Sequence, residues 1–136
     1  MRFRTAKRDD RNGVIALWQA CGLTREWNDP VIDFDFALSG ATSTILVYEI
    51  DGAIVASVMV GHDGHRGALY YLAVAPEHWQ KGLGRAAVVA AETFLEELGV
   101  WKINLMIRNE NEAALGFYKA IGFETNAVTS MGKKIG

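Results

Sequence analysis

The sequence lacks the several cysteines that cross-link small secreted domains and the long apolar runs that anchor a chain in a membrane. Of its 136 residues one is cysteine and two are proline. A lone Cys21 excludes an internal disulfide framework, and we expect a reduced, cytoplasmic setting. The apolar runs, such as residues 86–91, are far shorter than the ~20 residues of a membrane span. The charged first segment, MRFRTAKRDD, lacks the apolar core of a signal peptide, so none is expected.

Neither positive nor negative charge is in large excess, since the net charge is -2. A chain without a basic excess has no electrostatic reason to bind nucleic acid, and we expect none as a partner. There is no internal repeat, low-complexity tract or linker, so the interpretation is one domain over residues 1–136. Half of the residues are hydrophobic, and a chain of this length buries about two-thirds of its unfolded surface without a structural metal.

Two amphipathic helices are expected near the N-terminus. The first begins after Asp9 or Asp10 and ends at Gly22. Its apolar residues recur at helical spacing: Val14, Leu17, Trp18 and Cys21. This pattern places Cys21 in the core rather than in a reactive site. The second helix begins at Asp29-Pro30 and ends at Gly40.

Strand patterns dominate the middle of the chain. Residues 44–50 and 53–60 flank Asp51-Gly52, the favoured two-residue type I′ hairpin turn. The other expected strands are residues 3–7, 69–74, 102–107 and 128–135, and the later helices are 82–98 and 111–121. This order predicts an α+β fold: a mixed, mostly antiparallel sheet of six or seven strands with helices on both faces. Strands 69–74 and 102–107 should be parallel neighbours joined by a right-handed crossover.

Residues 72–87, LAVAPEHWQKGLGRAA, are the most informative segment. A strand ends there, and a turn containing Gly82 and Gly84 opens a long helix. Unpaired N–H groups at a helix start form an anion site suited to phosphate, and Lys81 and Arg85 add positive charge. The alternative is a plain tight turn with basic, solubilising residues. The residues needed for a P-loop or a dinucleotide-binding fingerprint are missing.

Residues 109–124, NENEAALGFYKAIGFE, form the second informative segment. Asn111 and Tyr118 are seven positions apart, about two helical turns, so an amide and a phenol share one face with Ala114 between them. The alternatives are structural. Asn111 or Asn109 would cap the helix, and Tyr118 would be a partly buried core aromatic.

Together the two segments resemble the GCN5-related N-acetyltransferase (GNAT) superfamily over essentially the whole chain. The resemblance rests on the strand ending LAV with a following Pro76, the Gly-x-Gly helix start, the N-x-x-A-x-x-x-Y pattern of residues 111–118 and Gly122-Phe123 after it. The chain is most similar to small bacterial members of the YpeA type, through WNDP at residues 27–30 and DGHRG before LYYLAV.

The resemblance implies an acetyl-CoA-dependent N-acetyltransferase in which the two parallel strands are central and splay apart around the cofactor. Backbone groups of the strand end would bind the pantetheine arm and the thioester: Leu72, Ala73 and Val74. The glycine turn would wrap the pyrophosphate: Gln80, Lys81, Gly82, Leu83, Gly84 and Arg85. Asn111 would contact the cofactor, and Tyr118 would be the catalytic residue beside the sulfur. Trp27, Asn28 and Asp29 would border the acceptor groove, although Asp29 could equally be a helix cap.

Two departures from the family pattern matter. Trp79 stands where the family usually has Arg or Gln, which we expect to weaken cofactor binding at most. Met106 stands where many members have a glutamate as general base, so the base is unassigned; Asp63, His65, Glu49 or a water relay are open alternatives.

The sequence therefore predicts transfer of an acetyl group from acetyl-CoA to a primary amine, of a small molecule or a peptide, by direct attack in a ternary complex. The alternative is a non-catalytic acyl-CoA-binding module that keeps the cofactor wedge. His62, Asp63 and His65 fit a polar turn better than a metal cluster, so no metal is expected. A homodimer is possible, as in many family members.

Overall fold

The computed structural model describes residues 2–136. The chain divides into two compact parts, Met1–Asn104 and Leu105–Gly136, which we call the first and second part and describe separately. The single domain over 1–136 stays a prediction. Among residues 2–136, no helix is both long and apolar enough to cross a membrane.

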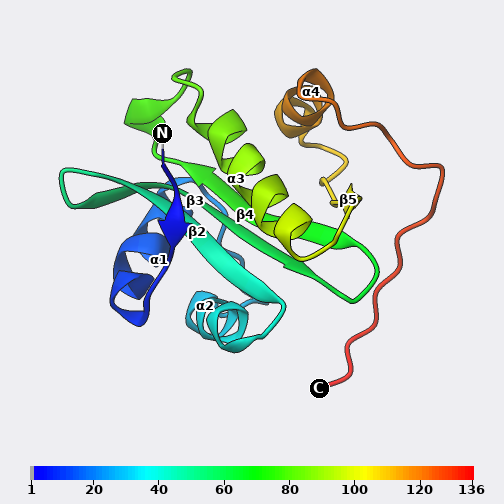
Figure 1. Ribbon diagram of the computed structural model, residues 1–136, viewed down its shortest axis with the longest axis horizontal. Coiled ribbons are helices and arrows are strands. Elements are labelled where there is room, and N and C mark those ends of the chain that lie inside the picture. Colours follow the sequence, from blue (N-terminus) through cyan, green and yellow to red (C-terminus); the bar gives the residue numbers. More distant parts are fainter. Residues whose placement is uncertain (1) are drawn as a thin grey trace. The chain divides into compact units, whose positions relative to one another are not determined.

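The first part is built on a sheet of five strands in the order β1-β2-β3-β4-β5 (Figure 1). The strands are β1 Arg4–Thr5, β2 Ser43–Ile50, β3 Ala53–His62, β4 Gly67–Val74 and β5 Ile103–Asn104. Consecutive strands pair antiparallel up to β4, whereas β4 and β5 are parallel. The mixed, mostly antiparallel sheet and its parallel pair are thus confirmed. The predicted six or seven strands are wrong, and the parallel pair lies at the edge of this sheet rather than at its centre.

The strand expected over residues 128–135 does not form. In the described residues of the second part the only regular element is α4, Glu112–Ala120. Val128, Met131 and Ile135 are 77%, 91% and 93% exposed. A strand is stable only when a neighbouring strand pairs with its backbone and its apolar face is covered, and this segment has neither. The expected strand 102–107 likewise shortens to two paired residues.

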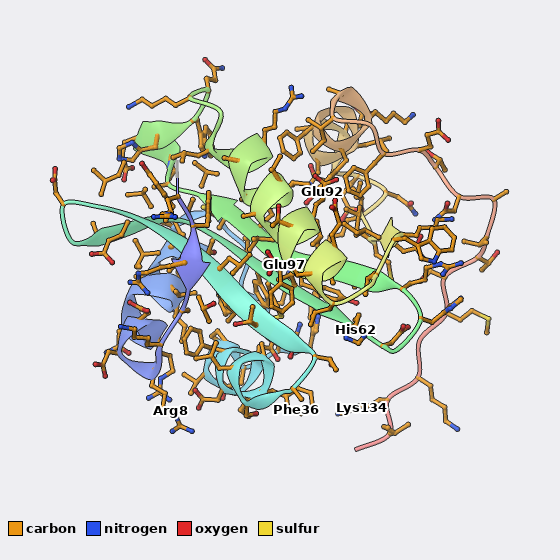
Figure 2. All side chains as sticks on the ribbon, viewed as in Figure 1. Arg8, Phe36, His62, Glu92, Glu97 and Lys134 are labelled. Carbon is orange, nitrogen blue, oxygen red and sulfur yellow. The ribbon has the colours of Figure 1, made fainter. Side chains whose placement is uncertain are left out.

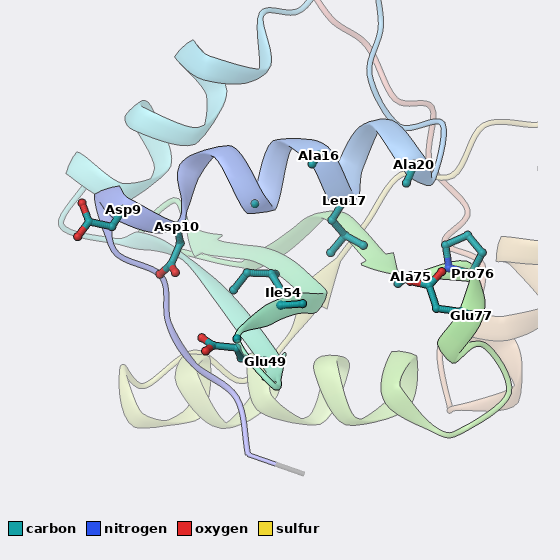
Figure 3. Close-up of a pocket in the computed structure, with 13 residues that line it drawn as sticks. Asp9, Asp10, Ala16, Leu17, Ala20, Glu49, Ile54, Ala75, Pro76 and Glu77 are labelled. Atoms are coloured by element: carbon teal, nitrogen blue, oxygen red, sulfur yellow. The ribbon is translucent and has the colours of Figure 1, made fainter.

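Helices cover both faces of the sheet in the first part. Helices α1, Arg11–Ala20, and α2, Pro30–Ser39, pack on one face, and α3, Leu83–Glu97, packs on the other. Figure 3 shows the sheet between α1 and α3. Between β4 and β5 the chain crosses through α3, as expected for a parallel pair.

The face under α1 and α2 holds the largest buried side chains. Trp18 and Phe34 are fully buried, and the indole N–H of Trp18 donates to Ser57 Oγ at 3.1 Å. This bond satisfies two buried polar groups that would otherwise cost stability. Cys21 packs against the same core, as predicted. Phe36, by contrast, is 80% exposed and projects outward from α2 (Figure 2).

The face under α3 is closed by small residues of β4. Leu95 of α3 is 1% exposed. It lies against buried Gly67, where an added Cβ would stand 2.5 Å from Leu95 Cδ1. Glycine therefore lets β4 and α3 approach closely at the point where β4 begins to pair with β5.

Local signals in the sequence set most element boundaries correctly. Asp51 and Gly52 have φ of 49° and 83°, as a type I′ turn requires. The carboxylate of Asp29 accepts from the N–H of Val31 at 2.9 Å and caps α2, with Pro30 in the first turn. The structural role considered for Asp29 is therefore confirmed.

Candidate functional site

A β-bulge in β4 is the structural centre of the candidate site. Ser57 of β3 pairs with Ala73, whereas Met59 pairs with Tyr70, so β4 holds one more residue than β3 in this interval. Tyr71 lies in the extra stretch with φ of 51°, a left-handed conformation that is costly for a residue other than glycine. Bulges re-aim side chains and are over-represented beside active sites.

Beyond the first two residues of β4, its outer edge has no strand partner within residues 2–104. Pairing with β5 involves only Gly67 with Ile103 and Ala68 with Asn104. Along residues 69–74 the ladder continues on the β3 side alone. Backbone groups on such an edge are preorganised donors and acceptors for a ligand. This edge includes the predicted cofactor residues Leu72, Ala73 and Val74.

The carbonyl of Val74, at the end of this edge, already accepts two hydrogen bonds. The indole N–H of Trp79 donates to it at 2.7 Å, and the thiol of Cys21 lies 3.2 Å away. Burial raises the pKa of Cys21, so the thiol keeps its proton and acts as a donor. Trp79, the residue that departs from the family pattern, is therefore bonded to a predicted cofactor contact. No pattern in the sequence predicts this bond.

The glycine turn before α3 has the backbone geometry of an anion site. Gly82 has φ of 83° and Gln80 has φ of 63°. Successive N–H groups around left-handed residues form concave nests that bind anions. Among the described residues no side chain caps α3, and its first turn contains no acidic residue. The first intrahelical bond runs from Ala86 to Gly82, so the preceding N–H groups are free to bind phosphate.

The pyrophosphate residues of the first part stay a prediction, and two of them carry positive charge at this helix start. Lys81 directly precedes Gly82, and Arg85 lies in the first turn of α3. Neither residue forms an ion pair within the described residues. Both side chains are therefore available to an anion at the helix start.

The second part carries the other predicted site residues. The amide oxygen of Asn111 accepts from the N–H of Ala114 at 3.0 Å, so Asn111 caps α4. Tyr118 is half-buried, with the rings of Phe117 and Phe123 edge-on at 5.0 Å and 5.3 Å between centroids. Burial raises the pKa of Tyr118 to about 12, which keeps its hydroxyl neutral. That Asn111 and Tyr118 join the β4 edge in one site stays a prediction.

Two of the alternatives considered for a general base, Glu49 and Asp63, are engaged elsewhere. Glu49 accepts from Arg4 at 2.7 Å. Asp63 accepts from the N–H groups of Arg66 and His65 in an exposed turn, and these bonds lower the pKa of Asp63. Met106 lies outside any strand, with its sulfur 3.1 Å from Ser130 Oγ. No group of three or more metal-ligating side chains occurs within residues 2–136.

A cavity of about 430 Å³ lies on the α1 side of the first part. Figure 3 shows Asp9, Asp10, Glu49 and Glu77 around it. Of these carboxylates, Asp10 and Glu49 are paired with Arg4. None of the predicted cofactor residues lines this cavity.

One pair of residues near the bulge was missed by the sequence interpretation. The hydroxyl of Tyr71 donates to the carboxylate of Asp33 at 2.6 Å. Asp33 lies in the first turn of α2, just after the expected acceptor-groove residues Trp27, Asn28 and Asp29. The two residues are 38 positions apart, so no local pattern could connect them.

Comparisons with known proteins agree with this geometry. Residues 8–123 match the model of the acetyltransferase (GNAT) family. An acetyltransferase of Yersinia pestis is 40% identical over 135 residues, which are 99% of this chain and 96% of the relative. An acetyltransferase of Pectobacterium atrosepticum is 41% identical over 135 residues, with the same shares of the two chains.

Solved structures share the fold at low sequence identity. The aminoglycoside acetyltransferase AAC(6')-Iy, in complex with a bisubstrate analogue containing CoA, superposes with a TM-score of 0.82 at 14% identity, over 98% of this chain and 97% of that one. The ribosomal-protein-S18-alanine N-acetyltransferase of Escherichia coli gives 0.78 at 21% identity, over 93% and 79%. These likenesses concern the fold alone.

Proposed function

Because the chain belongs to the acetyltransferase (GNAT) family, we propose that it transfers the acetyl group of acetyl-CoA to a primary amine by direct attack in a ternary complex. The enzyme is an acetyltransferase, as its relatives are named. The observation that carries the finer proposal is the outer edge of β4, unpaired beyond Ala68 within residues 2–104, together with the start of α3, which no described side chain caps and which carries basic residues. We also propose that residues 1–136 act as one domain.

The start of α3 fits the pyrophosphate of acetyl-CoA. Two left-handed residues, Gln80 and Gly82, shape the turn, and the helix adds its positive end. Lys81 and Arg85 supply the charge that matches the phosphates. Leu83 and Gly84 contribute backbone N–H groups only. Backbone groups would thus supply most of the contacts to the pyrophosphate, so binding can tolerate Trp79 beside them.

The edge of β4 fits the pantetheine arm and the thioester. Within residues 72–74, an N–H group that faces away from β3 would bind the thioester oxygen as negative charge develops on it during attack. The acceptor amine must be neutral to attack, although a lysine-like amine titrates near ~10.4. Most of the acceleration then comes from holding the neutral amine against an already activated acetyl donor.

In this proposal Tyr118 stabilises the departing thiolate. Its raised pKa of about 12 means that it remains a neutral O–H donor through the working range. A thiol titrates near ~8.5, so the thiolate gains a hydrogen bond from Tyr118 rather than taking the proton completely. Asn111 caps α4 with its oxygen, which leaves its amide N–H₂ to contact the cofactor.

The alternative, a non-catalytic acyl-CoA-binding module, is not favoured. The relatives at 40% and 41% identity are named acetyltransferases. The acceptor is less defined, since one neighbour in fold is named for aminoglycosides and another for the alanine of a ribosomal protein. We therefore propose an amine acceptor of a small molecule or a peptide.

The first test is a calorimetric titration of the purified protein with acetyl-CoA and CoA. We expect micromolar binding at roughly one cofactor per chain, followed by release of free thiol when an amine panel is added. The double variant Lys81→Ala/Arg85→Ala should bind more weakly. Lys133→Ala/Lys134→Ala, which removes the same charge from the C-terminal segment, should not. No heat and no thermal shift at millimolar acetyl-CoA would refute the proposal.

A further inference from the structure

We propose that Asp33 anchors a non-reacting ammonium group of the acceptor beside the bulge of β4, so that the preferred acceptors carry at least two amines. Tyr71 acts as the positioning residue that holds the carboxylate. This inference rests on the proposed acetyl transfer and names the substrate class of that site.

The position of the carboxylate follows from two contacts of Tyr71 and from the place of Tyr71 in β4. The ring of Tyr71 stacks on buried Trp18, with centroids 3.9 Å apart and planes 14° apart. Its hydroxyl then donates to Asp33 Oδ2 at 2.6 Å. Tyr71 is also the bulge residue that directly precedes Leu72, the first predicted contact of the thioester. The carboxylate is therefore fixed one side chain away from the unpaired edge of β4.

Four other carboxylates of the first part are already engaged. Asp10 and Glu49 pair with Arg4, and Asp35 pairs with Arg11. Asp29 caps α2. Within the described residues, only one oxygen of Asp33 has a hydrogen bond, and that bond is to a neutral hydroxyl. The other oxygen of Asp33 therefore remains open as an acceptor for a cation.

Arg25 carries the neighbouring positive charge that would compete with an ammonium group for Asp33. Its guanidinium donates to the carbonyl oxygens of Gly22 and Thr24, at 2.7 Å and 3.0 Å. Within residues 2–136 it forms no ion pair with Asp33. The hydrogen bonds of Arg25 are thus made within its own loop and not to the carboxylate of Asp33. Burial and the bond to Asp33 raise the pKa of Tyr71, so its hydroxyl remains a donor.

The weak basicity of carboxylates means that Asp33 would bind a cation rather than remove a proton from it. Carboxylates are far weaker bases than amines, so a carboxylate does not remove the proton of an ammonium that titrates near ~10.4. An ammonium paired with a carboxylate also holds its proton more tightly and cannot attack. The anchor therefore suits a second amine that stays charged while the first one reacts. Loss of such a charge-assisted bond changes affinity by roughly 10- to 100-fold.

The test compares cadaverine with n-pentylamine, which have the same carbon chain and differ by one amine. At saturating acetyl-CoA we expect the wild-type enzyme to prefer cadaverine by at least roughly 10-fold in kcat/KM. Asp33→Asn should raise the KM for cadaverine by roughly 10- to 100-fold with little change in kcat. Its rate with n-pentylamine and its acetyl-CoA affinity should be unchanged. The Asn oxygen still accepts from Tyr71, so the variant should fold.

Two further variants separate an anchor from a structural role. Asp35→Asn removes another carboxylate of α2 and should leave the preference for cadaverine intact. Tyr71→Phe keeps the stacked ring and frees the carboxylate, so it should lower the preference partly. If acetyl-CoA binds and Asp33→Asn keeps the wild-type KM for cadaverine, or no preference exists in the wild type, the anchor is refuted while acetyl transfer stands. If acetyl-CoA does not bind the wild type, both fail.

Discussion

Trp79 is the residue whose substitution should reveal whether the β4 edge receives the cofactor. Its indole N–H donates to the carbonyl of Val74 at 2.7 Å, and the side chain is 59% exposed. If the pantetheine arm uses that carbonyl, the indole must leave it first. Trp79→Phe removes the competing donor and keeps an aromatic ring in place. The substitution should therefore favour binding of acetyl-CoA.

The magnitude follows from the bond that is removed. A neutral hydrogen bond contributes about 0.5–1.5 kcal/mol. Trp79→Phe should thus tighten acetyl-CoA binding by about 2- to 12-fold. Cys21 limits the gain, because its thiol lies 3.2 Å from the same oxygen and remains there.

Isothermal titration calorimetry with acetyl-CoA measures this change directly. Trp101→Phe is the matched control, because Trp101 is 76% exposed and contacts Arg66 rather than β4. We expect its affinity to equal that of the wild type. Weaker binding by Trp79→Phe would mean that the indole supports the cofactor instead of competing with it. An unchanged affinity would mean that the carbonyl of Val74 is not a cofactor contact.

Three further predictions concern catalysis and stability. Tyr118→Phe should lower kcat by roughly 10- to 100-fold without changing CoA affinity; an unchanged kcat would refute the thiolate role. Since burial raises the pKa of Tyr118 to about 12, kcat/KM should rise as the acceptor amine loses its proton near ~10.4. A falling limb near pH ~9 that disappears in Tyr118→Phe would contradict this. Gly67→Ala places a methyl group 2.5 Å from Leu95 Cδ1 and should cost about 1–3 kcal/mol of unfolding free energy, measured by urea denaturation; an unchanged midpoint would contradict it.

Local chemistry explains which elements could be predicted from the sequence. Asp51-Gly52 needs two left-handed residues, and both are left-handed in the structure. Asp29 before Pro30 is a helix start, and its carboxylate caps α2. Gly82 before a long amphipathic segment marks the turn that opens α3. Each signal acts within a few residues, so the sequence contains the whole cause.

The features that could not be predicted from the sequence are those that depend on pairing between strands. The segment 128–135 has strand-forming residues, but a strand exists only where a partner strand pairs with it, and sequence pattern does not supply the partner. The β-bulge in β4 likewise depends on how the strand pairs with its neighbour. The run LYYLAV reads as a regular strand, and the extra residue becomes visible only in the register of Ser57 and Met59 against β4.

The bulge also explains why the proposed acceptor anchor could not be predicted from the sequence. A tyrosine with φ of 51° is strained by about 1–3 kcal/mol. Stacking on Trp18 and the bond to Asp33 offset that strain. The same contacts tie α1, α2 and β4 together at one point. The backbone strain, the buried ring and the carboxylate therefore form one unit, and each of its members is unremarkable when it is considered alone in the sequence.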